Sequence, residues 1–261
     1  MRRALVISSF VAKGTVGLQA TLPAFNGCSI EAISIPTVVL SNHPGFKACS
    51  GTAIECETLH AMLDALDANG WLSSIDAIFT GYLPSADHVR VAQTAIARVK
   101  AANPAALYLA DPVLGDDPSG LYVSRETAVA IRDILLPLAA ITTPNRFELA
   151  WLSGVDVTDR ATAVTAARRL DVPLTAATSI PCGDEHLENL LISPTETCIE
   201  TVKRLDAAPH GTGDFFAGVL LAEVLRDAAP ANALVEATRK TERLVAASQH
   251  SSDLVFAAVQ T

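Results

Sequence analysis

The feature that most constrains the fold of this chain is a regular alternation of short apolar runs and segments with helical spacing. Runs such as Ala4–Ser8 and Ala106–Val113 are largely apolar, which is typical of strands buried on both faces of a sheet. Segments such as Glu55–Ala68 place leucines at helical spacing and stop at Asn69-Gly70. This alternation predicts an α/β fold: a single-domain three-layer sandwich with a mostly parallel sheet and helices on both faces.

The predicted strands are Ala4–Ser8, Glu31–Val39, Asp76–Leu83, Ala106–Val113, Ala139–Thr143 and Leu174–Ser179, followed by a hairpin of Asn189–Ser193 and Thr197–Lys203. The predicted helices are Gly17–Phe25, Glu55–Ala68, Ser85–Ala102, Arg125–Leu136, Arg146–Ser153, Arg160–Leu170, Gly213–Asp227, Ala231–Gln249 and Leu254–Ala258. No linker, repeat or low-complexity tract interrupts them, so residues 1–261 are predicted to form one domain.

Composition excludes several classes of protein. Hydrophobic residues make up 50% of the chain and charged residues 18%, a balance opposite to that of a disordered chain. The net charge of −9 argues against a nucleic-acid partner, which usually needs a basic surface. The N-terminus lacks a signal cleavage site, and no apolar stretch approaches the roughly 20 residues of a membrane span. The five cysteines form no CxxC pair, so we expect buried free thiols in a reducing, cytoplasmic environment.

A polar cluster follows each predicted strand of the alternating region. In chain order these clusters read SSF, SNHPGF, GYLP, DPVLGD, TPNRFE and TSIPCGDE, and HGTGD leads into the predicted helix Gly213–Asp227. In parallel sheets, ligands bind beyond the carboxyl ends of the strands. We therefore expect one cleft at this edge of the sheet rather than separate surface loops.

The most specific motif is Gly211-Thr212-Gly213-Asp214, at the start of a strongly apolar helix. Glycines at a helix N-terminus let backbone N–H groups point at an anion, with the helix dipole behind them. Such amides, with a carboxylate that takes a proton from an attacking hydroxyl, suit phosphoryl transfer. No Lys-Ser/Thr pair follows the glycines, so this is not a Walker A loop. Taken alone, an aspartate in the first turn is also an ordinary favourable helix start.

Two further motifs carry carboxylates. Asp111 and Asp116, in DPVLGD, could face a magnesium ion or a polyphosphate, although Asp, Pro and Gly also form turns. Asn145 and Glu148, in TPNRFE, lie three residues apart on one helix face and could hold a metal-bound water. By itself, the second pair is better explained as a helix cap with a capping-box acid.

The stretch Ser41-Asn42-His43 places three hydrogen-bonding side chains before Pro44-Gly45. Together they could bind a polar heteroaromatic ring or a sugar, and His43 could shuttle a proton. The alternative is an ordinary polar loop in which the histidine makes a structural hydrogen bond.

In this order, the motifs resemble the ribokinase-like kinases of vitamins and sugars, and more closely the pyridoxal kinase branch. The matching stretches are SNHPGF (41–46), GYL (81–83), DPVLGD (111–116), GLYV (120–123), TPNRFEL (143–149), Thr178-Ser179 and GTGD (211–214). The resemblance implies a ribokinase-like fold. It also implies ATP- and Mg²⁺-dependent phosphorylation of the 5′-hydroxymethyl group of pyridoxal, pyridoxine or pyridoxamine. Members of this branch are usually homodimers, and some also use a monovalent cation such as K⁺.

The resemblance also implies a role for each matching residue. Asp214 matches the base near the substrate hydroxyl, and Gly211, Thr212 and Gly213 match the anion hole. The vitamer would be bound by Ser9, Ser41, His43, Tyr82 and Asp214. The nucleotide and its metal would be bound by Asp111, Asp116, Tyr122, Thr143, Asn145, Glu148, Thr178, Ser179 and Thr212, with Asp111, Asp116 and Glu148 around the magnesium.

The chain departs from the family pattern on the vitamin side. Phe10 stands where His is common, Leu18 where Asn is common, and Pro44 replaces a frequent Thr, while Lys13 is unusual. These changes bear on the preferred vitamer rather than on the phosphoryl chemistry. His210 stands where an apolar residue is usual, and we expect it to pack.

Two alternatives stay open. The chain could be a kinase for another small alcohol, such as hydroxymethylpyrimidine or a sugar, although SNH and DPVLGD count against this. It could also be a non-catalytic protein that binds a B6 vitamer, although the intact Asp214 and Glu148 count against that.

Overall fold

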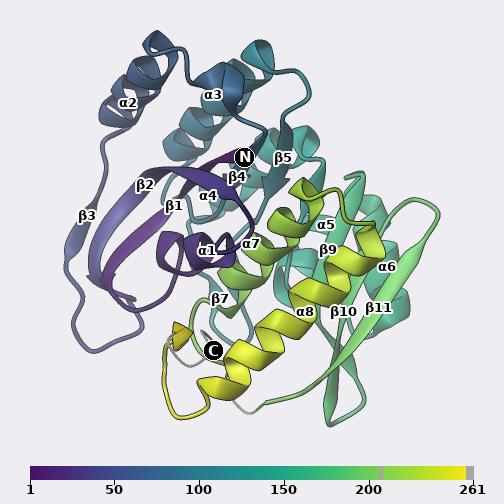
Figure 1. The fold of residues 1–261 in the computed structure, drawn as a ribbon. Helices are drawn as coiled ribbons and strands as arrows, with labels where there is room; N and C mark the ends of the chain where they lie inside the picture. Colours follow the sequence, from purple (N-terminus) through teal and green to yellow (C-terminus); the bar gives the residue numbers. More distant parts are fainter. Residues whose placement is uncertain (206–207, 257–261) are drawn as a thin grey trace.

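A nine-stranded sheet forms the centre of the molecule (Figure 1). The computed structural model describes residues 1–205 and 208–256. The strand order is β11-β10-β9-β8-β5-β4-β1-β2-β3. The six strands from β9 to β2 in this order run parallel, whereas β3, β10 and β11 are antiparallel to their neighbours. The carboxyl ends of six strands therefore meet at one edge.

The strands are β1 (Arg2–Lys13), β2 (Ile30–Asn42), β3 (Gly51–Ala53), β4 (Ala77–Thr80), β5 (Leu107–Ala110), β8 (Ile141–Thr142), β9 (Leu174–Cys182), β10 (His186–Ile192) and β11 (Thr197–Lys203). A separate two-stranded ladder joins β6 (Gly115–Asp116) to β7 (Gly120–Leu121). The helices are α1 (Leu18–Ala24), α2 (Cys56–Ala68), α3 (Ala86–Ala102), α4 (Arg125–Ala130), α5 (Arg146–Ser153), α6 (Arg160–Arg169), α7 (Thr212–Leu225) and α8 (Pro230–Ala247).

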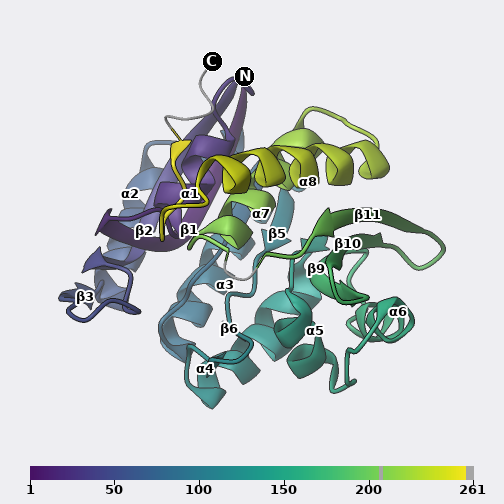
Figure 2. The ribbon, with the colours of Figure 1, turned by 90° about the horizontal axis from the view of Figure 1, so that it is seen from below.

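Helices cover both faces of the sheet, as predicted. Figure 2 shows α1, α7 and α8 on one side, and α3 to α6 on the other. The side chains of β1 divide between the two faces: Ala4 and Val6 join the core under α1 and α7, while Leu5 and Ile7 join the core under α2 and α3. Burial on both faces explains why this strand reads as a continuous apolar run. The predicted α/β sandwich is confirmed.

Helix α7 is buried and almost entirely apolar from Phe215 onward, because it lies between the sheet, α1 and α8. Its buried residues include Phe215, Phe216 and Leu220. A helix that is apolar all round has no solvent face and is held in place by its neighbours. Its N-terminus is thereby fixed relative to the carboxyl edge of the sheet.

Several predicted boundaries are wrong. Strand β1 continues to Lys13 and β2 to Asn42, so Ser9 and Ser41 lie within strands rather than in the loops after them. The two strands stay paired up to Lys13 and Asn42, with a register shift between Ser8 and Phe10, and this pairing extends them past the sheet core. The short antiparallel strand β3 was not predicted.

Further predicted boundaries differ later in the chain. Strand β9 extends to Cys182 because it pairs with β10 up to that residue. Helix α4 ends at Ala130 and is followed by a π-helical and a 3₁₀ turn that end at Leu138. In the predicted helix Leu254–Ala258, Leu254 and Val255 are not helical, and 257–258 lie outside the described residues. The N–H groups of Leu254 and Val255 donate to side-chain hydroxyls instead of helical carbonyls.

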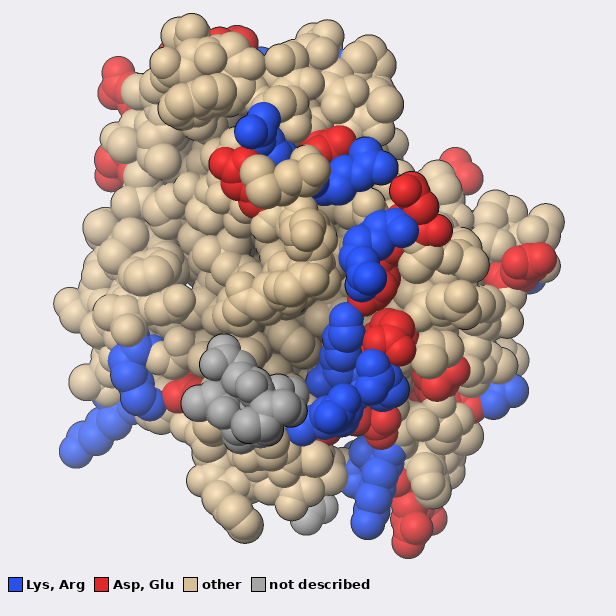
Figure 3. All heavy atoms as spheres, in the orientation of Figure 1, with Lys and Arg blue, Asp and Glu red and all other residues tan. Residues whose placement is uncertain are grey.

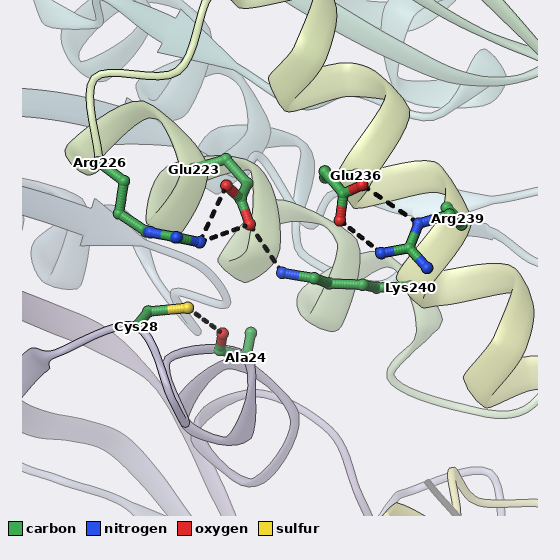
Figure 4. Close-up of polar contacts among 7 residues, drawn as sticks. All are labelled: Ala24, Cys28, Glu223, Arg226, Glu236, Arg239 and Lys240. Atoms are coloured by element: carbon green, nitrogen blue, oxygen red, sulfur yellow. Dashed lines mark hydrogen bonds and ion pairs between the residues drawn. The ribbon is translucent and has the colours of Figure 1, made fainter.

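All five cysteines are free, as predicted, but the expectation that they are buried is wrong. Cys49 is exposed and the other four are partly exposed. The thiol of Cys28 lies 3.9 Å from the carbonyl oxygen of Ala24 at the end of α1 (Figure 4). In the described part of the chain, no helix has the length and apolar character needed to cross a membrane.

Ion pairs join α7 to α8. Figure 3 shows basic side chains interleaved with acidic ones in a band down this face. Within it, the side chain of Glu223 on α7 is only 8% exposed and accepts from Lys240 of α8 at 2.7 Å and from Arg226 at 3.3 Å (Figure 4). Glu236 and Arg239 pair within α8 alone.

Replacing Glu223 should destabilise the fold more than replacing Glu236. In Glu223→Ala, Lys240 and Arg226 lose a buried carboxylate, which we expect to lower the free energy of unfolding by about 2 kcal/mol. In the matched control Glu236→Ala, the lost pair is more exposed and lies within one helix, so the change should stay below about 0.5 kcal/mol. Urea unfolding of both variants measures the difference, and equal losses would contradict a clamp between α7 and α8.

Candidate active site

Residues from widely separated segments meet at the carboxyl edge of the parallel strands. Gly81 and Tyr82 follow β4, Asp111 follows β5, and Thr143 follows β8. The first turn of α7 completes this edge, since Asp214 and Asp111 are close enough for Asp214 to raise the pKa of Asp111. The structure thus brings the GYLP, DPVLGD, TPNRFE and GTGD motifs, four of the clusters assigned to one cleft, to the same edge of the sheet.

The start of α7 has the form of an anion-binding turn. Gly211 has a φ of +86°, and a Cβ there would lie 1.6 Å from the carbonyl oxygen of Thr15. Only glycine fits this position. The next N–H groups, in the first turn of α7, have no helical acceptor. Gly213 borders open space, so an anion can approach them. The hydroxyl of Thr212 donates to the carbonyl of Pro209 at 2.7 Å. Because the hydroxyl proton is engaged there, the backbone N–H is the donor that Thr212 can offer to an anion.

Asp214 is half-buried in this turn and accepts a hydrogen bond from the backbone N–H of Gly17. Burial raises the pKa of Asp214 to about 6, although the Gly17 hydrogen bond acts in the opposite direction. The carboxylate is therefore ionised at pH 7 while keeping appreciable affinity for a proton. Those are the properties of a general base that works near neutral pH.

Asp111 is buried, and its pKa lies well above the ordinary range, because of burial and then the nearby charges of Asp214 and Glu148. The hydroxyl of Thr143 donates to Asp111 Oδ1 at 2.8 Å and partly offsets this. The charges of Asp214 and Glu148 thus act against ionisation of Asp111 at this edge of the sheet. A cation bound among them would lower the pKa of Asp111.

Asn145 and Glu148 form a complete capping box at the start of α5. Asn145 Oδ1 accepts from the Glu148 N–H, and Glu148 Oε2 accepts from the Asn145 N–H, both at 2.9 Å. The same side chains hold the DPVLGD loop: Glu148 Oε1 accepts from the Leu114 N–H at 2.7 Å, and Asn145 Nδ2 donates to the Gly115 carbonyl at 2.8 Å. Burial raises the pKa of Glu148 to about 7. The capping alternative is therefore correct for the geometry, and it positions Asp116.

Asp116 has a buried carboxylate oxygen, Oδ1, without a hydrogen-bond partner. Its carboxylate lies beside the hydroxyl of Tyr122, whose pKa is raised by burial and then by Asp116. A buried unpaired carboxylate oxygen is the kind of donor that Mg²⁺ takes. Asp111, Asp116 and Glu148 therefore fit magnesium by chemistry. Within residues 1–205 and 208–256, however, no three such side chains converge as a ready-made metal cluster.

Thr178 and Ser179 lie at a bulge in β9. Leu190 of β10 pairs with Ala177 and Glu188 pairs with Ile180, so two residues of β9 face one residue of β10. Ser179 adopts a positive φ of 61°. The Thr178 N–H donates to the Pro144 carbonyl at 3.0 Å, which places this bulge beside the start of the TPNRFE motif.

The residues expected on the vitamer side lie around the ends of β1, β2 and β4. Ser9 is buried beneath Gly17, where a Cβ would lie 2.2 Å from Ser9 Oγ. Tyr82 follows β4, and its N–H is bound by the hydroxyl of Ser8 at 3.2 Å. Burial raises the pKa of the Tyr82 phenol. Ser41 lies near the end of β2, and His43 follows in the loop between β2 and β3.

Sequence reasoning missed Thr15 and Gly17. Thr15 contributes a carbonyl and Gly17 an N–H, so neither is marked by a functional side chain. The one signal in the sequence was the pair of glycines in the segment Gly14-Thr15-Val16-Gly17. In the structure both glycines have a positive φ. It also missed Asp253, whose carboxylate pairs with Lys13 at 2.9 Å beside this loop.

Comparison with known proteins agrees with this geometry. A family model described as phosphomethylpyrimidine kinase matches residues 12–254. The chain therefore belongs to the phosphomethylpyrimidine kinase family. It is 36% identical over 239 residues to the pyridoxine/pyridoxal/pyridoxamine kinase of Bordetella avium, a match that covers 89% of this chain and 81% of that protein. It is 32% identical over 255 residues to the pyridoxal kinase PdxY of Leifsonia xyli subsp. xyli, covering 95% and 90%.

A solved structure gives the same result. The pyridoxal kinase of Leishmania donovani in complex with ADP and pyridoxamine has a TM-score of 0.89 and 30% identity to this chain, covering 97% of it and 92% of that protein. These relatives confirm the resemblance to the pyridoxal kinases, with their ribokinase-like fold, that the motifs predicted.

The raised pKa of Asp214 should lower the free energy of unfolding at neutral pH. An acid whose pKa is about 6 in the folded chain and near 4 in the unfolded chain binds fewer protons on unfolding between those values. Stability therefore falls as pH rises from about 4 to 6, and the cost is complete above about 6.

In Asp214→Asn this cost is removed. We expect the variant to be more stable than the wild type by about 1 to 2 kcal/mol at pH 8, after allowance for solvent screening at a half-buried group, with the gain vanishing toward pH 4. Denaturant unfolding at several pH values measures it. Asp171→Asn, at an exposed turn outside the site, is the matched control. A pH-independent gain in Asp214→Asn would contradict the raised pKa.

Proposed function

We propose that this protein transfers the γ-phosphoryl group of ATP to the 5′-hydroxymethyl group of a B6 vitamer, giving the 5′-phosphate. The observation that carries the proposal is Asp214, a partly buried base in the first turn of a helix that begins at a glycine turn with free N–H groups. Membership of a kinase family whose similar members are pyridoxal kinases supports the same substrate class.

The chain's own residues supply a base and an anion site. Asp214 accepts the proton of the 5′-hydroxyl as the hydroxyl oxygen attacks the γ-phosphorus. The bond from that phosphorus to the bridging oxygen of the β-phosphate breaks, and ADP leaves with that oxygen. The backbone N–H groups of the turn from Gly211 to Gly213 bind the transferring phosphoryl oxygens, where charge is concentrated in the transition state. The two groups belong to one turn, so a hydroxyl beside Asp214 is also aligned with the phosphoryl group.

On the nucleotide side, we propose that Thr178 and Ser179 contact the phosphates, with Tyr122, Thr143 and Asn145 beside them. Magnesium, when bound, would neutralise charge on the triphosphate, and Asp111, Asp116 and Glu148 are the residues that would hold it. On the vitamer side, we propose that Ser9, Ser41, His43 and Tyr82 bind the ring.

The deciding experiment is an ADP-release assay with Mg-ATP. Pyridoxal, pyridoxine, pyridoxamine and hydroxymethylpyrimidine are offered separately, with a control that lacks the second substrate. We expect turnover on at least one B6 vitamer at a higher kcat/KM than on hydroxymethylpyrimidine. Preference for hydroxymethylpyrimidine would favour the other small-alcohol activity, and tight vitamer binding without ADP release would indicate a non-catalytic binding protein.

Loss of the base should abolish most activity. In Asp214→Asn we expect kcat to fall by about 10³-fold, since general-base catalysis contributes roughly 10² to 10⁴. In the wild type, the ionised carboxylate is the active form, so kcat/KM for the vitamer should rise with pH through about 6 and then level off. A pH profile measured from 5 to 8 tests this, and full activity in Asp214→Asn would remove the residue from its role.

Asp116 should govern the magnesium requirement. Losing a buried, unpaired carboxylate charge in Asp116→Asn should raise the Mg²⁺ concentration for half-maximal rate about tenfold, with rescue at high Mg²⁺. Asp117→Asn is the control, because Asp117 is exposed and pairs with Arg146. EDTA should abolish activity in all variants. A Mg²⁺ dependence in Asp116→Asn equal to that of the wild type would exclude the residue as a metal ligand.

The resemblance supports three further proposals. We propose that residues 1–261 act as one kinase domain, that the protein is a homodimer, and that it works in the cytoplasm. Light scattering coupled to size exclusion tests the second. Rate measurements with K⁺ and Na⁺ exchanged test whether a monovalent cation is used.

A further inference from the structure

The side chain of His210, which has no role in the proposed machinery, links the loop between β2 and β3 to the glycine turn before α7. The ring of His43, between β2 and β3, stacks on the ring of His210, directly before the Gly211 turn. The ring centroids are 4.2 Å apart and the planes differ by 26°. Phe46, in the same hairpin loop, meets His210 edge-on at 6.1 Å. His210 thus packs, as expected, and its packing partner is a residue proposed to bind the substrate.

The loop from 41 to 50 holds its own shape. Ser41 Oγ donates to Asn42 Oδ1 at 2.6 Å and accepts from the Ser50 N–H at 3.0 Å. Asn42 Nδ2 donates to the carbonyls of His43 and Ala48 at 3.0 and 2.9 Å. Hydrogen bonds within the loop fix its conformation but not its placement over the site. The placement comes from what the loop contacts outside itself.

The protonation of His43 follows from its contacts. Its Nδ1 accepts a hydrogen bond from the Gly45 N–H at 3.1 Å, so the ring proton is on Nε2. Burial, and then the neighbouring His210, lower the pKa of His43, against the opposing effects of Asp253 and Asp116. His43 is therefore a neutral donor through Nε2–H, suited to an acceptor oxygen or nitrogen on a ring substrate.

His210 is itself firmly placed. Its N–H donates to the Ser252 carbonyl at 2.9 Å, and it forms a parallel bridge with Asp253. Asp253 accepts from Lys13 at 2.9 Å, and the Lys13 ammonium lies 5.1 Å from the centre of the Phe46 ring. The two loops are therefore joined by the histidine stack and, around its edge, by the chain from Asp253 through Lys13 to Phe46.

We propose that His210 is a positioning residue: its ring is the platform that holds His43, and with it the hairpin loop, at the vitamer site. The inference rests on the proposed function. Aromatic rings stacked at this distance contribute stability beyond the area they bury, so an aromatic replacement keeps the platform and alanine removes it. The residue before the glycine turn acts on the vitamer through His43 and not by touching it.

The test compares His210→Ala, His210→Phe, His43→Ala and the double variant His43→Ala/His210→Ala by steady-state kinetics. His60→Ala, on α2 and outside both loops, is the control. In His210→Ala we expect the KM for the vitamer to rise about tenfold while the KM for ATP stays within about twofold. In His210→Phe the vitamer KM should return to within about twofold of the wild type. The double variant should be no worse than His43→Ala alone, because both changes remove one interaction.

The other outcomes have distinct meanings. An unchanged vitamer KM in His210→Ala overturns the inference alone, as does a His210→Phe variant as impaired as His210→Ala. A double variant whose KM is the product of the two single effects shows that His210 acts independently of His43 and also overturns it. No turnover of any vitamer by the wild type overturns the proposed function and this inference together. Thermal unfolding of each variant checks that the fold is intact.

Discussion

The carbonyl oxygen of Thr15 lies so close to the α-carbon of Gly211 that no side chain fits between them. Thr15 Oγ1 also accepts from the Leu254 N–H at 2.8 Å, and Gly17 binds the carboxylate of Asp214. One short loop after β1 therefore fixes the turn of α7, the base in that turn and the C-terminal segment. The arrangement is a backbone contact, so it depends on glycine at one position and on the path of the loop rather than on a particular side chain.

The rest of the site is organised around carboxylates that are costly to bury. Asp111, Asp214 and Glu148 all have a raised pKa, with burial as the largest cause of each. Each is partly stabilised by a local donor: Thr143 for Asp111, the Gly17 N–H for Asp214, and backbone N–H groups of the DPVLGD loop for Glu148. These bonds offset burial without cancelling the repulsion between the acids. A bound cation would relieve the repulsion that these acids exert on Asp111.

The sequence was sufficient for the architecture because burial on both faces leaves a plain signal in strands such as β1 and β4. The convergence of the polar clusters followed from the parallel order alone. The contacts that shape the site were not predictable in the same way. Gly17 and Asp214 are 197 positions apart in the sequence, and the donor is a backbone N–H. The bulge at Ser179 and the strand positions of Ser9 and Ser41 depend on pairing with neighbouring strands, which local apolar patterns do not encode.

The contact between His43 and His210 was also not predictable from the sequence. His43 and His210 were each marked by the sequence, one as a polar loop residue and the other as a departure from the family pattern, yet nothing in either motif pairs them.

Asn145 and Glu148 show that a structural and a functional interpretation of one motif need not compete. The capping box is fully formed, which is the outcome that the motif alone favours. Glu148 Oε2 completes the cap, while the other carboxylate oxygen, Oε1, accepts from N–H groups of the loop that carries Asp116. Asn145 Nδ2 donates to the Gly115 carbonyl of the same loop. Because Glu148 is buried with the other acids, its charge reaches Asp111 as well. Two side chains at the sheet's carboxyl edge thus start a helix, hold a loop and contribute charge. The bonds that a residue makes in the folded chain therefore do not by themselves exclude it from the chemistry.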